Sequence, residues 1–291
     1  MTTSSSRARL VLGTAGLGLP YGARTRSDPD PERALRVIRE ALDAGVHRFD
    51  TAPAYGTAER LLGQALRNDG EIWTKLTAQG AEQALRSVEA SSVACCRMQL
   101  DLAQWHNWTA DLLKSKQWTA AHEALRTCGR VRGIGASTYG VADAIAAVRS
   151  GLFSVVQVEW NLLNQAVVRS VADDARAQGV QVAARSVLLQ GVLTQASEPL
   201  PARLAPLEHM RGEVARVATQ AGRSIQHLAL RAALDTSGID YVLVGAQSTA
   251  ELLEALVAAD SPPLDSELLA ACQALDRSTS SWVDPRQWPP A

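Results

Sequence analysis

The feature that most constrains the fold of this chain is a regular alternation of short apolar runs with longer segments of helical periodicity. Strands that alternate with helices build parallel sheets, because a helix carries the chain back to the starting edge before the next strand begins. Eight runs have the length and composition of strands. The expected strands are 10–13, 46–50, 71–75, 100–106, 132–136, 154–159, 181–186 and 241–244.

The segments between these runs have helical periodicity, and some carry clear end signals. Asp30 and Pro31 supply an N-cap and a first-turn proline, and Gly45 follows the end of the same helix. The expected helices are 31–44, 58–66, 82–91, 118–127, 141–149, 167–178, 208–220, 224–234, 249–258 and 265–275.

Eight strand–helix units in 291 residues predict a single (β/α)8 TIM-barrel domain over residues 1–291, with an extra C-terminal helix and tail. The main alternative, a doubly wound open sheet, requires a glycine-rich dinucleotide loop that leads from the first strand into a helix. Residues 13–18 give only G-x-x-G-x-G, and Pro20, Tyr21 and Gly22 continue as a loop. The sequence therefore favours the barrel.

The composition narrows the functional class. A formal net charge of −1 argues against a general binder of nucleic acid or anionic membranes. No apolar run is long enough to span a bilayer, and residues 1–10 contain no signal-peptide core, so we expect a soluble, cytoplasmic protein. Cys95, Cys96, Cys128 and Cys272 fit neither a zinc spacing nor a disulfide framework, and we expect no metal site.

Polar side chains stand at the ends of three successive expected strands. Asp50, Lys75 and His106 close the second, third and fourth strands, and Tyr55 follows Asp50 in the next loop. Catalytic groups of such barrels lie at the C-terminal ends of the strands. We therefore expect these four side chains to converge at one edge of the barrel mouth.

Together the four residues suit proton transfer to a carbonyl oxygen. A phenol is a poor acid at neutral pH, but a neighbouring ammonium group stabilises its anion. Lys75 could supply that charge, Asp50 could hold Lys75 protonated, and His106 could donate a hydrogen bond to the substrate oxygen. Reduction of the carbonyl also needs a hydride donor, which implies a nicotinamide cofactor.

At this point the motifs resemble those of the aldo-keto reductases. The catalytic segments are FDTAPAYG at 49–56, TK at 74–75 and QWHN at 104–107; GIGAS at 133–137, VQVEWN at 156–161 and VGAQS at 244–248 follow in the family's order. The resemblance covers roughly residues 10–258. The opening LGTAGLGLPYG at 12–22 is most similar to a bacterial branch associated with sugar metabolism.

The resemblance implies an NAD(P)(H)-dependent oxidoreductase that interconverts an aldehyde, ketone or sugar and its alcohol, with Tyr55 as general acid and base. It also implies a set of cofactor contacts. Ser137 and Gln157 would lie at the nicotinamide carboxamide, Gly13, Thr14 and Ala15 near its ribose, Arg185 in the place of the stacking residue, Ser186, Leu188 and Gly191 along the pyrophosphate, and Gly245, Gln247 and Ser248 near the adenosine. Asp50 is a further expected cofactor contact.

Three positions depart from the family pattern. Thr138 replaces an asparagine beside Ser137, and Arg185 replaces the aromatic residue that stacks on the nicotinamide. A guanidinium can also stack, but its charge disfavours the oxidised ring. Leu253 stands where an arginine often binds the 2′-phosphate. We expect NADP(H) as cofactor, with NAD(H) as the alternative.

The substrate pocket is less constrained by the sequence. Trp108, Trp160, Trp282 and Trp288 are candidate walls, because an indole offers an apolar face and one donor. We expect a small carbonyl compound or sugar as substrate, and the sequence leaves the oligomeric state open.

Two other functions remain open at this stage. One is a lyase that uses Lys75 as a Schiff-base amine. The other is a nucleotide-binding regulatory subunit with little turnover.

Overall fold

The chain forms a closed barrel of eight parallel strands in sequential order, in which β1 pairs with both β2 and β8. The computed structural model describes residues 6–23, 28–194 and 199–290, so Met1–Ser5 of the segment inspected for a signal peptide lies outside them. The strands are β1 (Leu10–Gly13), β2 (Arg48–Asp50), β3 (Glu71–Leu76), β4 (Leu100–Trp108), β5 (Val131–Thr138), β6 (Val155–Glu159), β7 (Gln181–Arg185) and β8 (Tyr241–Gly245).

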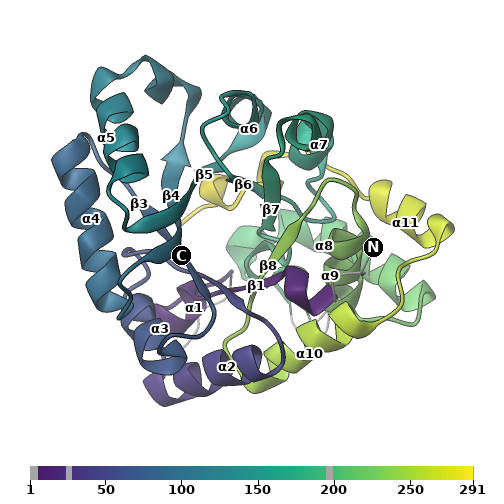
Figure 1. The fold of residues 1–291 in the computed structure, drawn as a ribbon. Coiled ribbons are helices and arrows are strands. Elements are labelled where there is room, and N and C mark those ends of the chain that lie inside the picture. Colours follow the sequence, from purple (N-terminus) through teal and green to yellow (C-terminus); the bar gives the residue numbers. More distant parts are fainter. Residues whose placement is uncertain (1–5, 24–27, 195–198, 291) are drawn as a thin grey trace.

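Helices surround the barrel (Figure 1). They are α1 (Ala15–Gly18), α2 (Pro31–Asp43), α3 (Ala58–Leu66), α4 (Ala81–Ala94), α5 (Lys116–Thr127), α6 (Gly140–Arg149), α7 (Ala166–Gln178), α8 (Pro206–Gln220), α9 (Ile225–Asp235), α10 (Thr249–Asp260) and α11 (Ser266–Gln273), with short 3-10 turns η1 (Ser6–Arg9), η2 (Ala110–Lys114), η3 (Leu189–Gly191), η4 (Ala202–Leu204), η5 (Ser281–Val283) and η6 (Pro285–Gln287).

The expected barrel is confirmed, and most elements lie within a few residues of their predicted bounds. The N-cap signal is also confirmed, because the Asp30 carboxylate accepts from the amides of Glu32 and Arg33. The predicted loop at Pro20, Tyr21 and Gly22 is confirmed, but the single helical turn α1 that precedes it was not predicted. No helix in the described ranges is long and apolar enough to cross a membrane.

The barrel interior follows the two-residue period of a strand, in which successive side chains point to opposite faces. Leu10 and Leu12 point outward into the large core beneath the helices, whereas Val11 between them belongs to a separate interior cluster. That cluster comes from six strands and comprises Val11, Trp73, Leu102, Val155, Ala183 and Leu243. These side chains fill one layer of the barrel, so the structure beneath the mouth is a packed core.

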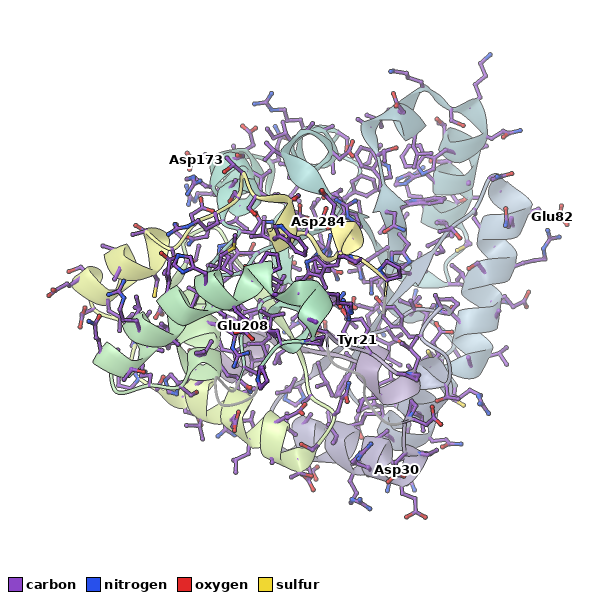
Figure 2. The ribbon with its side chains drawn as sticks, turned by 180° about the vertical axis from the view of Figure 1, so that it is seen from behind. Tyr21, Asp30, Glu82, Asp173, Glu208 and Asp284 are labelled. Atoms are coloured by element: carbon purple, nitrogen blue, oxygen red, sulfur yellow. The ribbon has the colours of Figure 1, made fainter. Side chains whose placement is uncertain are left out.

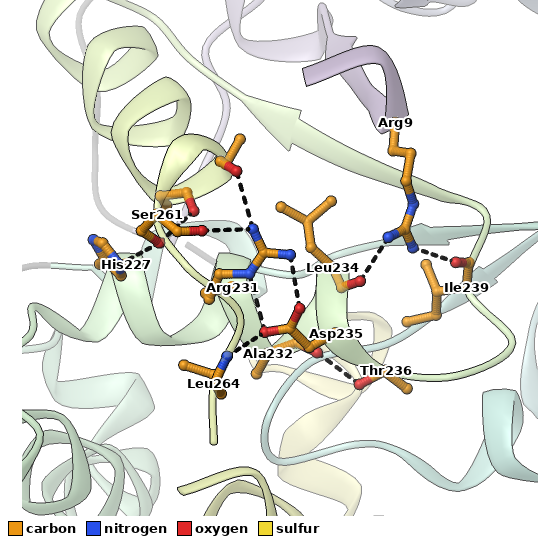
Figure 3. A network of polar contacts seen from close by, with 12 residues as sticks. Arg9, His227, Arg231, Ala232, Leu234, Asp235, Thr236, Ile239, Ser261 and Leu264 are labelled. Carbon is orange, nitrogen blue, oxygen red and sulfur yellow. Dashed lines mark hydrogen bonds and ion pairs between the residues drawn. The ribbon is translucent and has the colours of Figure 1, made fainter. Parts of the chain in front are cut away.

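A buried polar network joins α9 to α10 and to the segment that follows α10 (Figure 3). The Arg231 guanidinium makes a bidentate pair with Asp235 and donates to the Ala259 carbonyl, with the Arg231 side chain 3% exposed. Asp235 in turn accepts from the Leu264 amide at 2.8 Å. The pair therefore joins α9 to the segment after α10.

Candidate active site

The polar residues of the barrel mouth lie two positions beyond the apolar interior layer, and hence on the same inward face of each strand. Polar groups or glycines thus replace the apolar core at the C-terminal strand ends. The resulting layer comprises Gly13 after Val11, Lys75 after Trp73, Gln104 after Leu102, Gln157 after Val155, Arg185 after Ala183 and Gly245 after Leu243.

Lys75 and Asp50 form a buried ion pair at the centre of this layer. The Lys75 ammonium donates to Asp50 Oδ1 and to the Thr51 carbonyl, the latter at 3.0 Å. The Lys75 side chain is 2% exposed, and burial alone would lower its pKa. Electrostatic interactions and hydrogen bonds with Asp50 and Tyr55 outweigh that effect and raise the pKa of Lys75 above its ordinary value, so the ammonium stays charged.

Tyr55 and His106 complete the predicted tetrad. The Lys75 nitrogen lies 4.9 Å from the centroid of the Tyr55 ring, and the Tyr55 and His106 rings meet edge to face at 6.5 Å. Burial and the charge of Lys75 lower the pKa of His106 to about 4. His106 is therefore neutral at physiological pH and can serve as a hydrogen-bonding group beside Tyr55. The structure brings together all four predicted catalytic residues.

The loop that carries Tyr55 rests directly on the loop after β1. The Thr57 amide donates to the Gly18 carbonyl at 3.3 Å. A Cβ on Gly18 would lie 2.7 Å from the Ala58 amide nitrogen and still closer to the Tyr55 carbonyl oxygen, and a Cβ on Gly56 would strike the Gly18 carbonyl. Only glycine allows these two backbones to approach so closely.

A cavity of about 570 Å³ opens beside Tyr55 and runs across the ends of β7, β8 and β1. The predicted cofactor residues that line it are Gly13, Thr14, Ala15, Asp50, Gln157, Arg185, Ser186, Leu188, Gly191, Gly245, Gln247 and Ser248. Ser137 is the exception. It is the register partner of Gln157 on the neighbouring strand, but it is buried outside the lining.

The tryptophans expected to form the substrate pocket do not line this cavity. Trp108 is fully buried and packs against Trp118 and Phe153. Strand alternation from His106 would turn Trp108 inward, but the β4–β5 register shifts between Trp105 and Trp108, and Asn107 has a φ of 56°. This irregularity turns Trp108 towards the helices.

Trp160 and Trp282 also lie outside the cavity lining, as does Trp288. Trp160 is 1% exposed, and the Trp282 carbonyl accepts from the Trp288 indole within the tail at 2.8 Å. Besides Tyr55, the aromatic residue in the lining is Tyr21, which the sequence reasoning did not select. Burial raises the pKa of Tyr21 to about 12, so its hydroxyl stays protonated.

The C-terminal tail lies over the end of the barrel that carries the cavity. Figure 2 shows this end, with Asp284 on the tail and Tyr21 labelled. The Arg286 guanidinium lies 3.6 Å from the centroid of the Tyr139 ring, and the Arg185 guanidinium lies 4.0 Å from that centroid. Arg185 also donates to Glu159 Oε2 at 3.2 Å. Glu159 therefore compensates the positive charge of Arg185. This compensation weakens the penalty that the sequence predicted for an oxidised nicotinamide beside Arg185.

Gln104 is a second residue of the site that the sequence reasoning missed. It is fully buried and donates from Nε2 to Asp50 Oδ2 at 3.0 Å. The strand period could have identified it, because it stands two residues before His106 on the same face of β4. A glycine on β5 leaves room for it, since a Cβ on Gly135 would lie 3.0 Å from the Gln104 Cγ.

Comparison with known proteins gives concordant matches. The model described as "Aldo/keto reductase family" matches residues 9–277. The chain is 27% identical to Aldo-keto reductase YhdN of Bacillus subtilis (strain 168), over 91% of this chain and 88% of that protein. It is 24% identical to the NADH-specific methylglyoxal reductase of Escherichia coli (strain K12), over 66% and 67% of the two chains. The solved holo form of AKR11C1 from Bacillus halodurans superimposes with a TM-score of 0.77 at 22% identity, covering 93% and 92% of the two chains.

Proposed function

This chain belongs to the aldo/keto reductase family of oxidoreductases, and on that basis we propose that it interconverts a carbonyl compound and its alcohol with Tyr55 as general acid and base. The observation that carries this proposal is the charged Lys75 beside Tyr55 at one end of an elongated cavity. A small aldehyde, ketone or sugar would lie against Tyr55 and His106.

The cavity fits a nicotinamide dinucleotide. Its volume is within the usual range for cofactor sites, and glycines form its floor at the ends of β1 and β8. A Cβ on Gly13 or Gly245 would meet no protein atom closer than 3.7 Å, so the cavity itself occupies the space that side chains would fill. Gln157 and Asp50 would lie beside the nicotinamide end, and Gln247 and Ser248 beside the adenosine end.

When bound, the cofactor supplies or accepts the hydride. Tyr55 donates a proton to the carbonyl oxygen in the direction of reduction, and it accepts that proton in the direction of oxidation. Lys75 favours the proton loss because its charge stabilises the phenolate, and Asp50 keeps Lys75 in place. Neutral His106 offers a hydrogen bond to the substrate oxygen without adding charge.

We take NADP(H) as the first cofactor to test, because the family resemblance favours it. A specific observation supports NAD(H) as the alternative: Glu251 and Glu254 line the cavity beside Gln247 and Ser248. Carboxylates repel a 2′-phosphate but accept hydrogen bonds from a free ribose hydroxyl. Leu253, in the place of the expected arginine, is 58% exposed and lies outside the lining.

The Schiff-base alternative fits the site less well. Such a lysine must lose its proton to act as a nucleophile. The contact with Asp50 instead raises the pKa of Lys75 and keeps its amine occupied in two hydrogen bonds.

Substitution of Tyr55 by Phe tests the proposal. Removing only the hydroxyl should lower kcat by at least about 100-fold while leaving the cofactor Kd unchanged, because the ring remains in place. The assay follows NAD(P)H consumption with methylglyoxal and with small sugars, and cofactor binding is measured by tryptophan fluorescence. Near-normal turnover by Tyr55→Phe would exclude the proposed role of Tyr55.

A further inference from the structure

We propose that Gln104 is a positioning residue for Gln157. It orients the Gln157 amide so that the Gln157 carbonyl oxygen faces the cavity and accepts a hydrogen bond from the amino group of the nicotinamide carboxamide. The inference rests on the proposed function, because it assigns a contact to the nicotinamide end of the cavity. Gln104 lies outside the cavity lining and would act through Asp50 and Gln157.

Three hydrogen bonds connect these residues in a closed triangle. Gln104 and Gln157 both donate from Nε2 to Asp50 Oδ2, at 3.0 and 2.9 Å, and Gln157 Nε2 also donates to Gln104 Oε1 at 3.2 Å. All three residues are at most 3% exposed. Water does not compete for these groups at that depth, so the triangle holds a single arrangement.

The chemistry of Asp50 fixes which way both amides point. Asp50 pairs with the Lys75 ammonium through its other oxygen, and a carboxylate accepts hydrogen bonds but cannot donate them. The atoms that face Asp50 Oδ2 must therefore be the amino groups of Gln104 and Gln157. A reversed amide would place two oxygens in contact without a proton between them.

This orientation determines what Gln157 can offer a ligand. Its amino group has two hydrogens, and Asp50 and Gln104 accept both of them. The group left to face the cavity is the carbonyl oxygen, which only accepts. A carboxamide would therefore meet Gln157 through its N–H, and a ring substituent that lacks this donor would bind less well.

The triangle also links the cofactor contact to the proton donor. Asp50 uses Oδ1 for Lys75 and Oδ2 for the two glutamines. One carboxylate therefore positions both the ammonium beside Tyr55 and the amide beside the nicotinamide. Gln104 holds the Gln157 amide in place by accepting a hydrogen bond from it.

The test compares three ligands: the natural dinucleotide, its 3-acetylpyridine analogue, which lacks the amino group, and ADP-ribose or its 2′-phosphate, which lacks the ring. Wild type should bind the natural cofactor about tenfold more tightly than the analogue, the value of one well-placed hydrogen bond. Gln104→Met keeps the side-chain length but removes both hydrogen bonds. It should weaken the natural cofactor by about tenfold, abolish the discrimination and leave ADP-ribose unchanged.

Gln165→Met is the matched control. Gln165 is also buried, and its amide donates to the Leu162 and Cys272 carbonyls; none of these residues lines the cavity. This variant loses two internal hydrogen bonds as well, but it should keep wild-type discrimination between the natural cofactor and the analogue.

The outcomes separate this inference from the proposed function. A wild-type protein that binds no dinucleotide overturns both. Equal affinity of wild type for the natural cofactor and the analogue overturns the inference alone, even if Gln104→Met fails to fold. Equal weakening of the cofactor and ADP-ribose by Gln104→Met also overturns it, because that result indicates general structural damage.

Discussion

The contact between Gly18 and the Tyr55 loop gives the strongest prediction about how the fold positions the catalytic hydroxyl. In Gly18→Ala the new methyl would lie 2.7 Å from the Ala58 amide nitrogen, about 0.7 Å short of the 3.4 Å of an ordinary contact. It would lie closer still to the Tyr55 carbonyl oxygen. Both obstacles are backbone atoms, so the loop that carries Tyr55 must move as a whole.

A displacement of this size should affect catalysis far more than folding. Overpacking of this kind costs about 1–3 kcal/mol of stability, whereas a misplacement of about 1 Å in a catalytic group can lower turnover by about 100-fold. We therefore expect kcat of Gly18→Ala to fall by one to two orders of magnitude. The assay is carbonyl reduction at saturating cofactor, with the folded fraction measured by urea denaturation.

Gly212→Ala provides the matched control for this substitution. Gly212 lies within α8, and a Cβ there would have no neighbour within 4 Å. Alanine should stabilise the helix by about 0.5–1 kcal/mol and leave kcat unchanged. If Gly18→Ala folds and retains kcat within a factor of two or three of wild type, the loop contact does not position Tyr55.

Two further predictions concern stability. The pKa of His106 is about 4 in the fold and 6.5 in a free side chain, so the unfolded state takes up a proton first as the pH falls below 6.5. The free energy of unfolding should therefore decrease towards pH 4, by up to about 2–3 kcal/mol at pH 4.5. Urea unfolding at pH 7.5 and 4.5 measures this loss, and His106→Gln should remove it. Asp235→Ala leaves the Arg231 guanidinium buried without its carboxylate and should cost about 3–5 kcal/mol in chemical denaturation. Asp111→Ala, which breaks an exposed pair with Lys114, should leave the midpoint unchanged, and equal effects of the two alanine variants would contradict the role given to the buried pair.

The sequence predicted the elements whose signals are local. The bounds 10–13 and 58–66 agree with β1 and α3, because apolar runs and capping residues act within a few positions of each other. The convergence of Asp50, Lys75 and His106 followed from the rule that strand ends meet at the mouth. Gln104 was not predicted, because it stands two residues before the expected end of its strand. Its inward face was nevertheless predictable from the strand period.

Other features depend on interactions that are distant along the chain. Trp108 was misplaced because a single irregular residue, Asn107, reverses the alternation beyond it. The stacking of Arg286 on Tyr139 joins the tail to the loop after β5, and no local pattern in either segment indicates the other. Ser137 stands on β5 beside Gln157, one residue beyond the predicted strand, and its burial outside the cavity depends on how neighbouring side chains fill the space.

The position of the cavity connects ligand binding to the closure of the barrel. The cavity lies across the pairing of β1 with β8, where the first and last strands of the barrel meet. Gln247 reinforces this junction by donating to the Tyr21 carbonyl, 226 positions earlier in the chain. Such distant pairings form slowly, because a long loop must close before any contact repays its entropy. A molecule that fills the cavity contacts both strands at once, so it should slow hydrogen exchange of the amides along this junction more than elsewhere in the barrel.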